Sequence, residues 1–105
     1  MSSAFQKKLD TQTNRVVITP PMDFNFSCLT EFMQAFEEES IDRAIELDLQ
    51  HVRHIDSSAL GMLLLIRERW EGSPNEVVLS NLHSNRELER LIEVVHFDKL
   101  FTIER

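Results

Sequence analysis

The spacing of apolar positions alternates along the chain between the two-residue period of a strand and the longer period of a helix. A β-branched run, Arg15–Thr19, is the clearest strand, and Pro20 and Pro21 end it because neither has an N–H to donate. Shorter apolar runs predict further strands at residues 4 to 9, 44 to 49, 76 to 80 and 100 to 103. Asn14 and residues 72 to 75 are expected in turns.

Two of the segments between these strands have the pattern of amphipathic helices. The first starts after Asn25 or Ser27, either of which is a suitable N-cap. The second is opened by a predicted capping box, Ser84 with Glu87. Each segment collects apolar residues on one face, namely Leu29, Phe32, Met33 and Phe36 in the first, and Leu88, Leu91, Ile92 and Val95 in the second.

A third helical segment, from residue 59 to about residue 70, is apolar almost all round until Arg67. A helix of this kind needs burial on more than one side. Two interpretations stay open at this point. Either two layers of the domain cover the helix, or Met62 and Leu65 form a docking surface for a partner, a task that suits the adaptable methionine side chain.

Alternating strands and helices predict an α/β fold, with a mixed or parallel sheet of about four to five strands flanked by helices. The chain has 105 residues, and no repeat or linker divides it. A length of this order accommodates one core. We therefore expect one domain over residues 1–105.

Charge and composition narrow the class of protein. The formal net charge is −7, which opposes binding to nucleic acid or to an anionic membrane. No apolar run approaches the roughly 20 residues that span a bilayer, and the N-terminus lacks a signal-peptide pattern. Cys28 is the only cysteine, so an internal disulfide is impossible. We expect a cytoplasmic protein in which Cys28 is a small packing residue.

The most informative stretch lies between the strand at residues 44 to 49 and the apolar helix. Asp56, Ser57 and Ser58 stand where that helix begins, beside unpaired backbone N–H groups and the positive end of the helix dipole. A phosphate on either serine would be held by the helix start. The simpler interpretation is that Asp56 and Ser57 only cap the helix.

The run from His54 to Leu64, HIDSSALGMLL, resembles the signature of STAS domains of bacterial anti-sigma factor antagonists. The resemblance extends over nearly the whole chain in element order, length and charge, and it implies a mixed sheet flanked by helices. In that family the first serine after the aspartate is phosphorylated by the partner, which here implies Ser57. The acidic residue that often precedes the first helix corresponds to Asp23. Ala59, where glycine is common, and the Pro20-Pro21 entry depart from the family pattern.

The resemblance also implies partners. They are an anti-sigma factor that is a serine kinase of the histidine-kinase-like ATPase type, and a PP2C-type phosphatase. The unphosphorylated chain would sequester the kinase through a surface that includes Asp23, Asp56, Ser57 and Ser58. Phosphorylation would add roughly −1.5 to −2 charge units at the helix start, which the fold tolerates and the interface does not.

Enzymatic alternatives lack the residues they need. The chain has no Gly-x-Ser-x-Gly elbow and no glycine-rich phosphate loop. His51 and His54 lie across a loop rather than on one helix face, so we expect no metal or other cofactor. The remaining rival is a non-catalytic STAS subunit of a membrane (lipid) ABC transport complex. The complete Asp-Ser-Ser sequence favours phosphoregulation over that role.

Overall fold

The computed structural model describes residues 5–104. A central mixed sheet has the strand order β1-β2-β4-β6-β7. These strands are β1 (Gln6–Asp10), β2 (Arg15–Thr19), β4 (Ile45–Asp48), β6 (Val77–Ser80) and β7 (Thr102–Glu104). β1 pairs antiparallel with β2, and each later neighbour pairs in parallel. The α/β fold with a mixed sheet of four to five strands is therefore confirmed.

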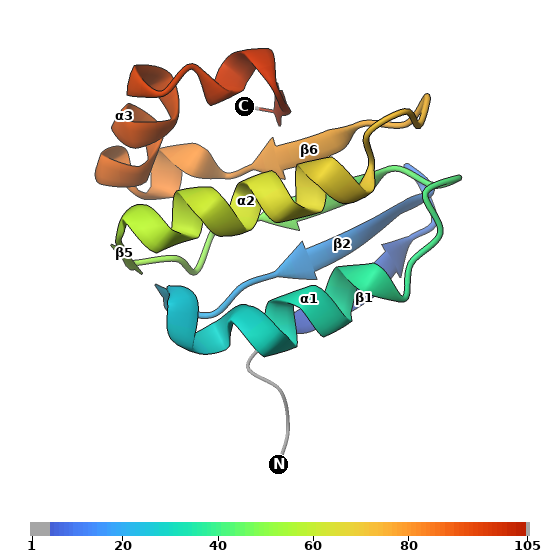
Figure 1. Cartoon of the computed structure of the whole chain (residues 1–105), viewed down its shortest axis with the longest axis horizontal. Coiled ribbons are helices and arrows are strands. Elements are labelled where there is room, and N and C mark those ends of the chain that lie inside the picture. The colour runs from blue at the N-terminus through green and yellow to red at the C-terminus, as the bar shows by residue number, and fades with distance from the viewer. Residues whose placement is uncertain (1–4, 105) are drawn as a thin grey trace.

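Two helices cross one face of this sheet side by side (Figure 1). Helix α1 (Leu29–Glu37) leads from β2 to β4, and α2 (Ser57–Arg69) leads from β4 to β6. Parallel neighbours need such crossover connections because a tight hairpin cannot join them. Helix α3 (Arg86–Val94) follows β6 at the end of the sheet to which the β6 arrow points. Three short 3-10 turns complete the connections, η1 (Phe26–Cys28), η2 (Leu82–Ser84) and η3 (Phe97–Lys99).

The core lies between the sheet and the helices. Alternate residues of the central strands face it, such as Ile45 and Leu47, both fully buried. Phe24 and Phe32 meet edge to face with ring centroids 5.2 Å apart, the geometry that the ring quadrupoles favour. Helix α2 contributes Met62, Leu63 and Ile66, each at most 2% exposed. Sheet and neighbouring helix thus cover most of α2, as the first of the two interpretations predicts.

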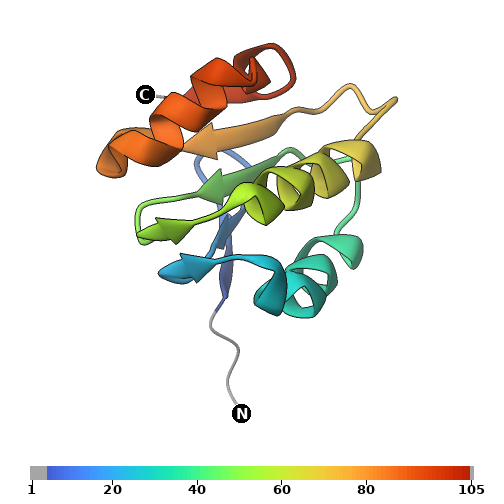
Figure 2. The same cartoon turned by 60° about the vertical axis from the view of Figure 1, so that its left-hand side comes forward.

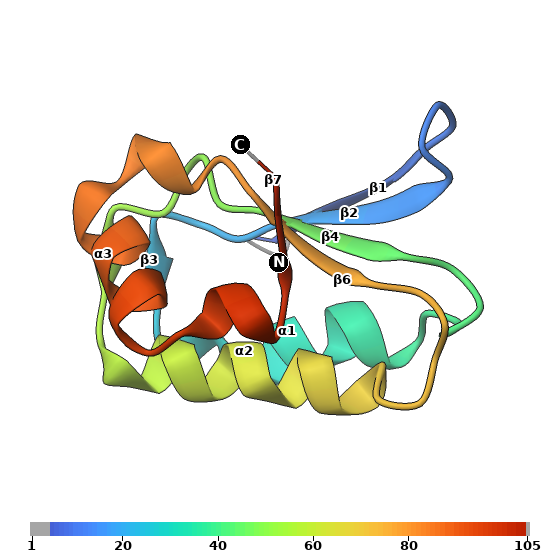
Figure 3. The ribbon, with the colours of Figure 1, turned by 90° about the horizontal axis from the view of Figure 1, so that it is seen from above.

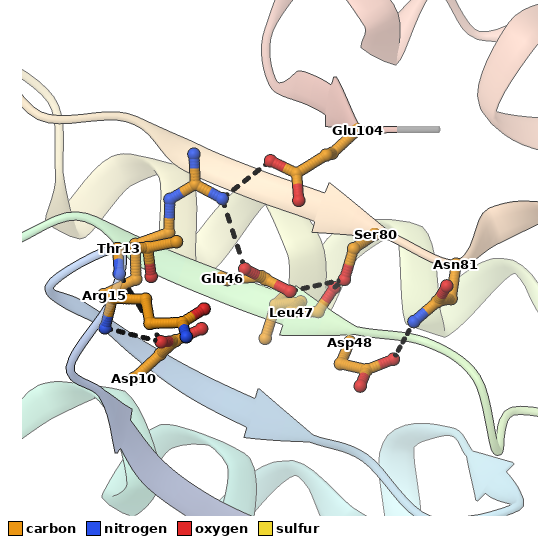
Figure 4. Close-up of polar contacts among 10 residues, drawn as sticks. Asp10, Thr13, Arg15, Glu46, Leu47, Asp48, Ser80, Asn81 and Glu104 are labelled. Atoms are coloured by element: carbon orange, nitrogen blue, oxygen red, sulfur yellow. Dashed lines mark hydrogen bonds and ion pairs between the residues drawn. The ribbon is translucent and has the colours of Figure 1, made fainter.

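The opposite face of the sheet carries no helix within residues 5–104 (Figure 3). Polar side chains from several strands join there instead (Figure 4). Arg15 Nη1 lies 3.3 Å from Glu46 Oε1 and 2.7 Å from Glu104 Oε2. The Ser80 hydroxyl donates to Glu46 Oε2 at 2.8 Å. This network satisfies charged groups on a sheet surface that solvent reaches.

Two local expectations need correction. The capping box at Ser84 is wrong, because α3 begins at Arg86 and its N-cap is Asn85, whose Oδ1 accepts from the amides of Glu87 and Leu88. The Ser84 hydroxyl instead donates to the carbonyl of Asn81 at 2.8 Å. The last strand begins at Thr102, because the two residues before it close the turn of η3. Residue 4 of the first predicted strand lies outside the described residues.

Candidate functional site

The predicted polar site lies at the start of α2, at the end of the molecule where the parallel strands of the main sheet finish (Figure 2). A second small sheet supports it. Its strands β3 (Asp23–Phe24) and β5 (His54–Ile55) pair in parallel, with Asp23 opposite His54 and Phe24 opposite Ile55. β3 leads into η1 and β5 leads into α2. Two segments about 30 residues apart in sequence are thus held side by side.

Asp56 is the N-cap of α2. Its backbone is extended, and its Oδ1 accepts from the amide of Ser58 at 3.0 Å and from the Ser58 hydroxyl. These hydrogen bonds, the one from the Ser58 hydroxyl first, lower the pKa of the Asp56 carboxyl below its ordinary value. The capping role expected of Asp56 is confirmed.

The two serines have different environments. Ser58 is half-buried, and besides donating to Asp56 its hydroxyl accepts from the backbone amide of Phe26 at 3.0 Å. Ser57 is exposed, and within residues 5–104 its hydroxyl has no hydrogen-bond partner. Ser57 therefore does not cap the helix with its side chain. Its hydroxyl is open to a reagent from outside the chain.

Asp23 belongs to the same end of the molecule. Its Oδ1 lies 2.6 Å from Nδ1 of His54, across the β3–β5 pair. Both side chains are largely exposed, at 64% for Asp23 and 71% for His54. Asp23, Asp56, Ser57 and Ser58, predicted from separate parts of the sequence, thus share one supporting unit. His54 is an addition that sequence reasoning treated only as a surface or loop histidine.

Sequence reasoning missed two exposed apolar residues, Phe26 next to Ser58 and Met22 next to β5. Phe26 is 66% exposed and Met22 is 54% exposed. The Met22 carbonyl accepts from the amides of Arg53 and His54, which fixes that residue beside β5. Large apolar side chains exposed to solvent can mark an interaction site. The sequence gives little sign that Phe26 is exposed, because an aromatic residue just before a helix is often buried.

The predicted docking surface on α2 needs correction. Met62 is 2% exposed, so it is a core residue and not a contact for a partner. Residue 62 lies about 140° around the helix from Ser57, whereas residue 64 lies within about 20° of it. Leu64, at 43% exposed, accordingly occupies the outer face together with Gly61. Leu65 is half-buried and packs against the core at the groove between α1 and α2.

Among residues 5–104 no group of three or more histidine, cysteine or acidic side chains is placed to hold a metal. Cys28 is buried, and burial raises the pKa of its thiol, which makes it a packing residue. No helix in that range has the length and apolarity to span a bilayer.

The chain is similar to known proteins in sequence and in fold. A STAS-domain-containing protein of Pseudomonas aeruginosa (strain UCBPP-PA14) is 35% identical over 81 residues, which span 76% of this chain and 78% of that protein. A candidate anti-sigma factor antagonist from Thermotoga maritima, solved by crystallography, superposes with a TM-score of 0.78 at 23% identity, over 94% of this chain and 84% of the other. The NMR structure of the same protein gives a TM-score of 0.74 at 21% identity, over 99% and 82% of the two chains.

These two solved structures establish the fold alone, because their identity to this chain is low. The family assignment comes from the sequence. A family model described as the Mlab, STAS domain matches residues 5–103, and so includes every element from β1 to most of β7. This chain belongs to the STAS domain family.

Proposed function

We propose that this protein is a non-catalytic anti-sigma factor antagonist, or the equivalent antagonist in another partner-switching cascade. In its unphosphorylated form it binds a kinase of the histidine-kinase-like ATPase type. Phosphorylation of Ser57 by that kinase releases it, and a PP2C-type phosphatase restores it. The observation that carries the proposal is the exposed Ser57 hydroxyl at the start of α2, which has no hydrogen-bond partner among residues 5–104, whereas the Ser58 hydroxyl beside it makes two hydrogen bonds.

The contrast between the two serines supports Ser57 as the phosphoacceptor. Phosphoryl transfer to Ser58 would replace the proton that its hydroxyl donates to Asp56 and so break that hydrogen bond, and it would place the phosphate on the oxygen that accepts from the Phe26 amide. Transfer to Ser57 disturbs neither bond. The cap on α2 therefore survives modification of Ser57, and the folded structure persists in both states of the switch.

The same placement explains how phosphate would release a partner. A phosphoserine adds roughly −1.5 to −2 charge units, here next to the carboxylate of Asp56. The positive end of the α2 dipole lies at this start of the helix and stabilises the anion within the chain. A partner that packs on the helix start would have to bury the dianion, and the desolvation cost weakens the complex.

The test is affinity purification from the native cell with the native chain, Ser57→Ala and Ser57→Asp, followed by mass spectrometry of Ser57. We expect an ATPase of the kinase type bound to Ser57→Ala and lost from Ser57→Asp. Ser40→Asp is the matched control, because Ser40 is exposed and follows α1 at the opposite end of the molecule. Loss of the partner from Ser40→Asp as well would attribute the effect to charge alone.

The transport-complex subunit is the alternative that the same experiment decides. Recovery of membrane transporter subunits with all variants, and an unmodified Ser57, would replace the switch by a constitutive role. Equal binding of the kinase to Ser57→Ala and Ser57→Asp would also overturn the switch. Neither outcome affects the family assignment.

A further inference from the structure

We infer that Phe26 is the anchor residue of the partner interface and that Ser58 is the residue that positions it. The inference deepens the proposed function and rests on it for the identity of the partner. The partner is a protein whose contact surface has an apolar pocket for the Phe26 ring, next to a cation that faces Asp23. Ser57 lies at the edge of this contact.

The outward orientation of Phe26 follows from its neighbours. Phe24 on one side is 1% exposed, and Cys28 on the other is 9% exposed, so both anchor the segment to the core. The residue between them, at the start of η1, is left 66% exposed. Asn25 fixes the turn by accepting from the Ser27 amide at 3.0 Å. Phe26 is therefore an exposed ring on a well-connected backbone.

Ser58 connects this ring to the helix that carries Ser57. The Phe26 amide donates to the Ser58 hydroxyl at 3.0 Å, and that hydroxyl donates in turn to the capping carboxylate of Asp56. A rigid aromatic side chain on a fixed backbone loses little conformational entropy when it binds. Aromatic residues are enriched at the centre of protein interfaces for this reason and for the area they bury.

Charge decides among the possible occupants of this surface. Asp23 is 64% exposed close to Met22 and the start of η1, and the chain as a whole carries −7. A second copy of the chain would bring the same carboxylate and the same net charge against them, which is unfavourable. An anionic membrane is disfavoured for the same reason. A protein with an apolar pocket and a nearby lysine or arginine matches the Phe26 ring and the exposed Asp23 carboxylate, whose Oδ1 also contacts Nδ1 of His54.

The apolar contact at Phe26 also bears on how phosphorylation of Ser57 releases the partner. Ser57 is next to Ser58, whose hydroxyl is bonded to the Phe26 amide, so a phosphate on Ser57 lies beside the contact. Burying that dianion against the apolar pocket carries a desolvation cost, which weakens the contact. The partner therefore discriminates the two states through the pocket that receives Phe26.

The test uses photo-crosslinking in the native cell, with Phe26→p-benzoylphenylalanine in the full chain. Val94→p-benzoylphenylalanine is the matched control, because Val94 is an apolar residue with a similar exposure of 64% at the end of α3. We expect one protein to be crosslinked at position 26 and not at position 94, with the crosslink mapped to an apolar pocket beside a lysine or arginine. An equal or absent adduct at position 26, an adduct with a second copy of the chain, or an adduct with lipid would overturn the inference.

The failure of the proposed function is recognised separately. If the crosslinked protein is a transporter subunit, or if Ser57→Asp leaves the adduct unchanged, the partner switch fails while the Phe26 surface stands. If the adduct is the kinase and Ser57→Asp abolishes it, both stand. If Ser57→Ala retains the kinase but position 26 gives no adduct, the switch stands and the Phe26 surface is wrong.

The positioning role of Ser58 has its own readout. With the purified partner, Phe26→Ala is expected to weaken binding at least about tenfold, and Val94→Ala to leave it unchanged. Ser58→Ala is expected to speed hydrogen exchange of the Phe26 amide and to weaken binding by a smaller factor, and Ser58→Thr to restore both. Unchanged exchange and affinity in Ser58→Ala would remove Ser58 from the interface.

Discussion

The carboxylate of Asp56 accepts the amide N–H of Ser58 at 3.0 Å, and this bond caps the helix that carries Ser57. The cap leaves the Ser57 side chain out of the helix-start hydrogen bonds. The three residues of Asp-Ser-Ser thus have different roles. The aspartate caps the helix, the second serine connects the helix to η1, and the first serine is exposed. A modification of Ser57 adds charge without removing a structural bond.

The first prediction concerns pH. Hydrogen bonds to Asp56 lower its pKa in the folded chain, so the unfolded chain takes up the proton first as pH falls. The stabilisation is complete above the unfolded pKa of about 3.9 and is lost as pH falls through the lower folded value. Asp56→Asn, which keeps an acceptor but cannot titrate, should therefore show a smaller fall in Tm between pH 5 and about pH 2. Thermal unfolding followed by circular dichroism measures this. An equal fall in Tm in Asp56→Asn and the native chain would show that Asp56 does not contribute to the loss of stability in acid.

The second prediction tests which residues of α2 are core. Met62→Ala removes a side chain that is 2% exposed, and it should cost about 2–5 kcal/mol in the free energy of unfolding. Leu64→Ala removes one that is 43% exposed, and its cost should stay within about 0.5–1 kcal/mol. Urea denaturation of both variants gives the comparison. A cost of Leu64→Ala as large as that expected of Met62→Ala would show that the outer face of α2 is covered in solution.

The main sheet and its helices were predictable from the sequence because burial imposes a period on it. β2 and β6 are apolar runs, and β4 alternates apolar with acidic residues. The faces of α1 and α3 that hold Phe32 and Leu88 follow helical spacing. Asp56 was predictable as a cap because its residue type and place before an apolar run carry the signal.

What sequence reasoning missed depends on contacts between distant segments. The outer face of α2 has no polar stripe, so spacing alone could not separate buried Met62 from exposed Leu64. The β3–β5 pair has two residues in each strand, too few to give a period. Phe26 reads as one more core aromatic until the turn of η1 places it outside. The hydrogen bond that separates Ser58 from Ser57 comes from the backbone of Phe26, and a backbone partner leaves no trace in residue identities.

The third prediction concerns Asn85, the unexpected cap of α3. Its Oδ1 accepts from the amides of Glu87 and Leu88, and its amide nitrogen donates to the carbonyls of Val52 and Arg53, each at 3.2 Å. Asn85→Ala loses both the cap and this connection, and should cost about 1–2 kcal/mol in the free energy of unfolding. Asn85→Asp keeps the cap but not the hydrogen bonds to the carbonyls of Val52 and Arg53, and its free energy of unfolding should lie between those of the native chain and Asn85→Ala. Ser84→Ala, measured in the same urea titrations, is the control, because it removes only the hydroxyl that donates to the Asn81 carbonyl. A cost of Asn85→Ala no larger than that of Ser84→Ala would contradict the capping role of Asn85.

The fourth prediction concerns the helix-free face of the sheet. Glu46 is the centre of its network, because one carboxylate oxygen faces Arg15 at 3.3 Å and the other accepts from buried Ser80 at 2.8 Å. Glu46→Ala leaves the Ser80 hydroxyl only a 3.4 Å contact with the carbonyl of Leu47, and should cost about 1–2 kcal/mol. Glu46→Gln keeps an acceptor for Ser80 and should cost less.

Glu104 provides the control for this network. It also pairs with Arg15, at 2.7 Å, but its side chain is 50% exposed, so Glu104→Gln should change the free energy of unfolding by less than about 1 kcal/mol. Urea denaturation at low and high salt separates the ion pair of Arg15 and Glu104 from the Ser80 hydrogen bond. Salt screens the exposed ion pair and leaves the hydrogen bond unchanged. If Glu46→Ala cost no more than Glu104→Gln, the Ser80 bond would add nothing, and solvent would satisfy that hydroxyl equally well.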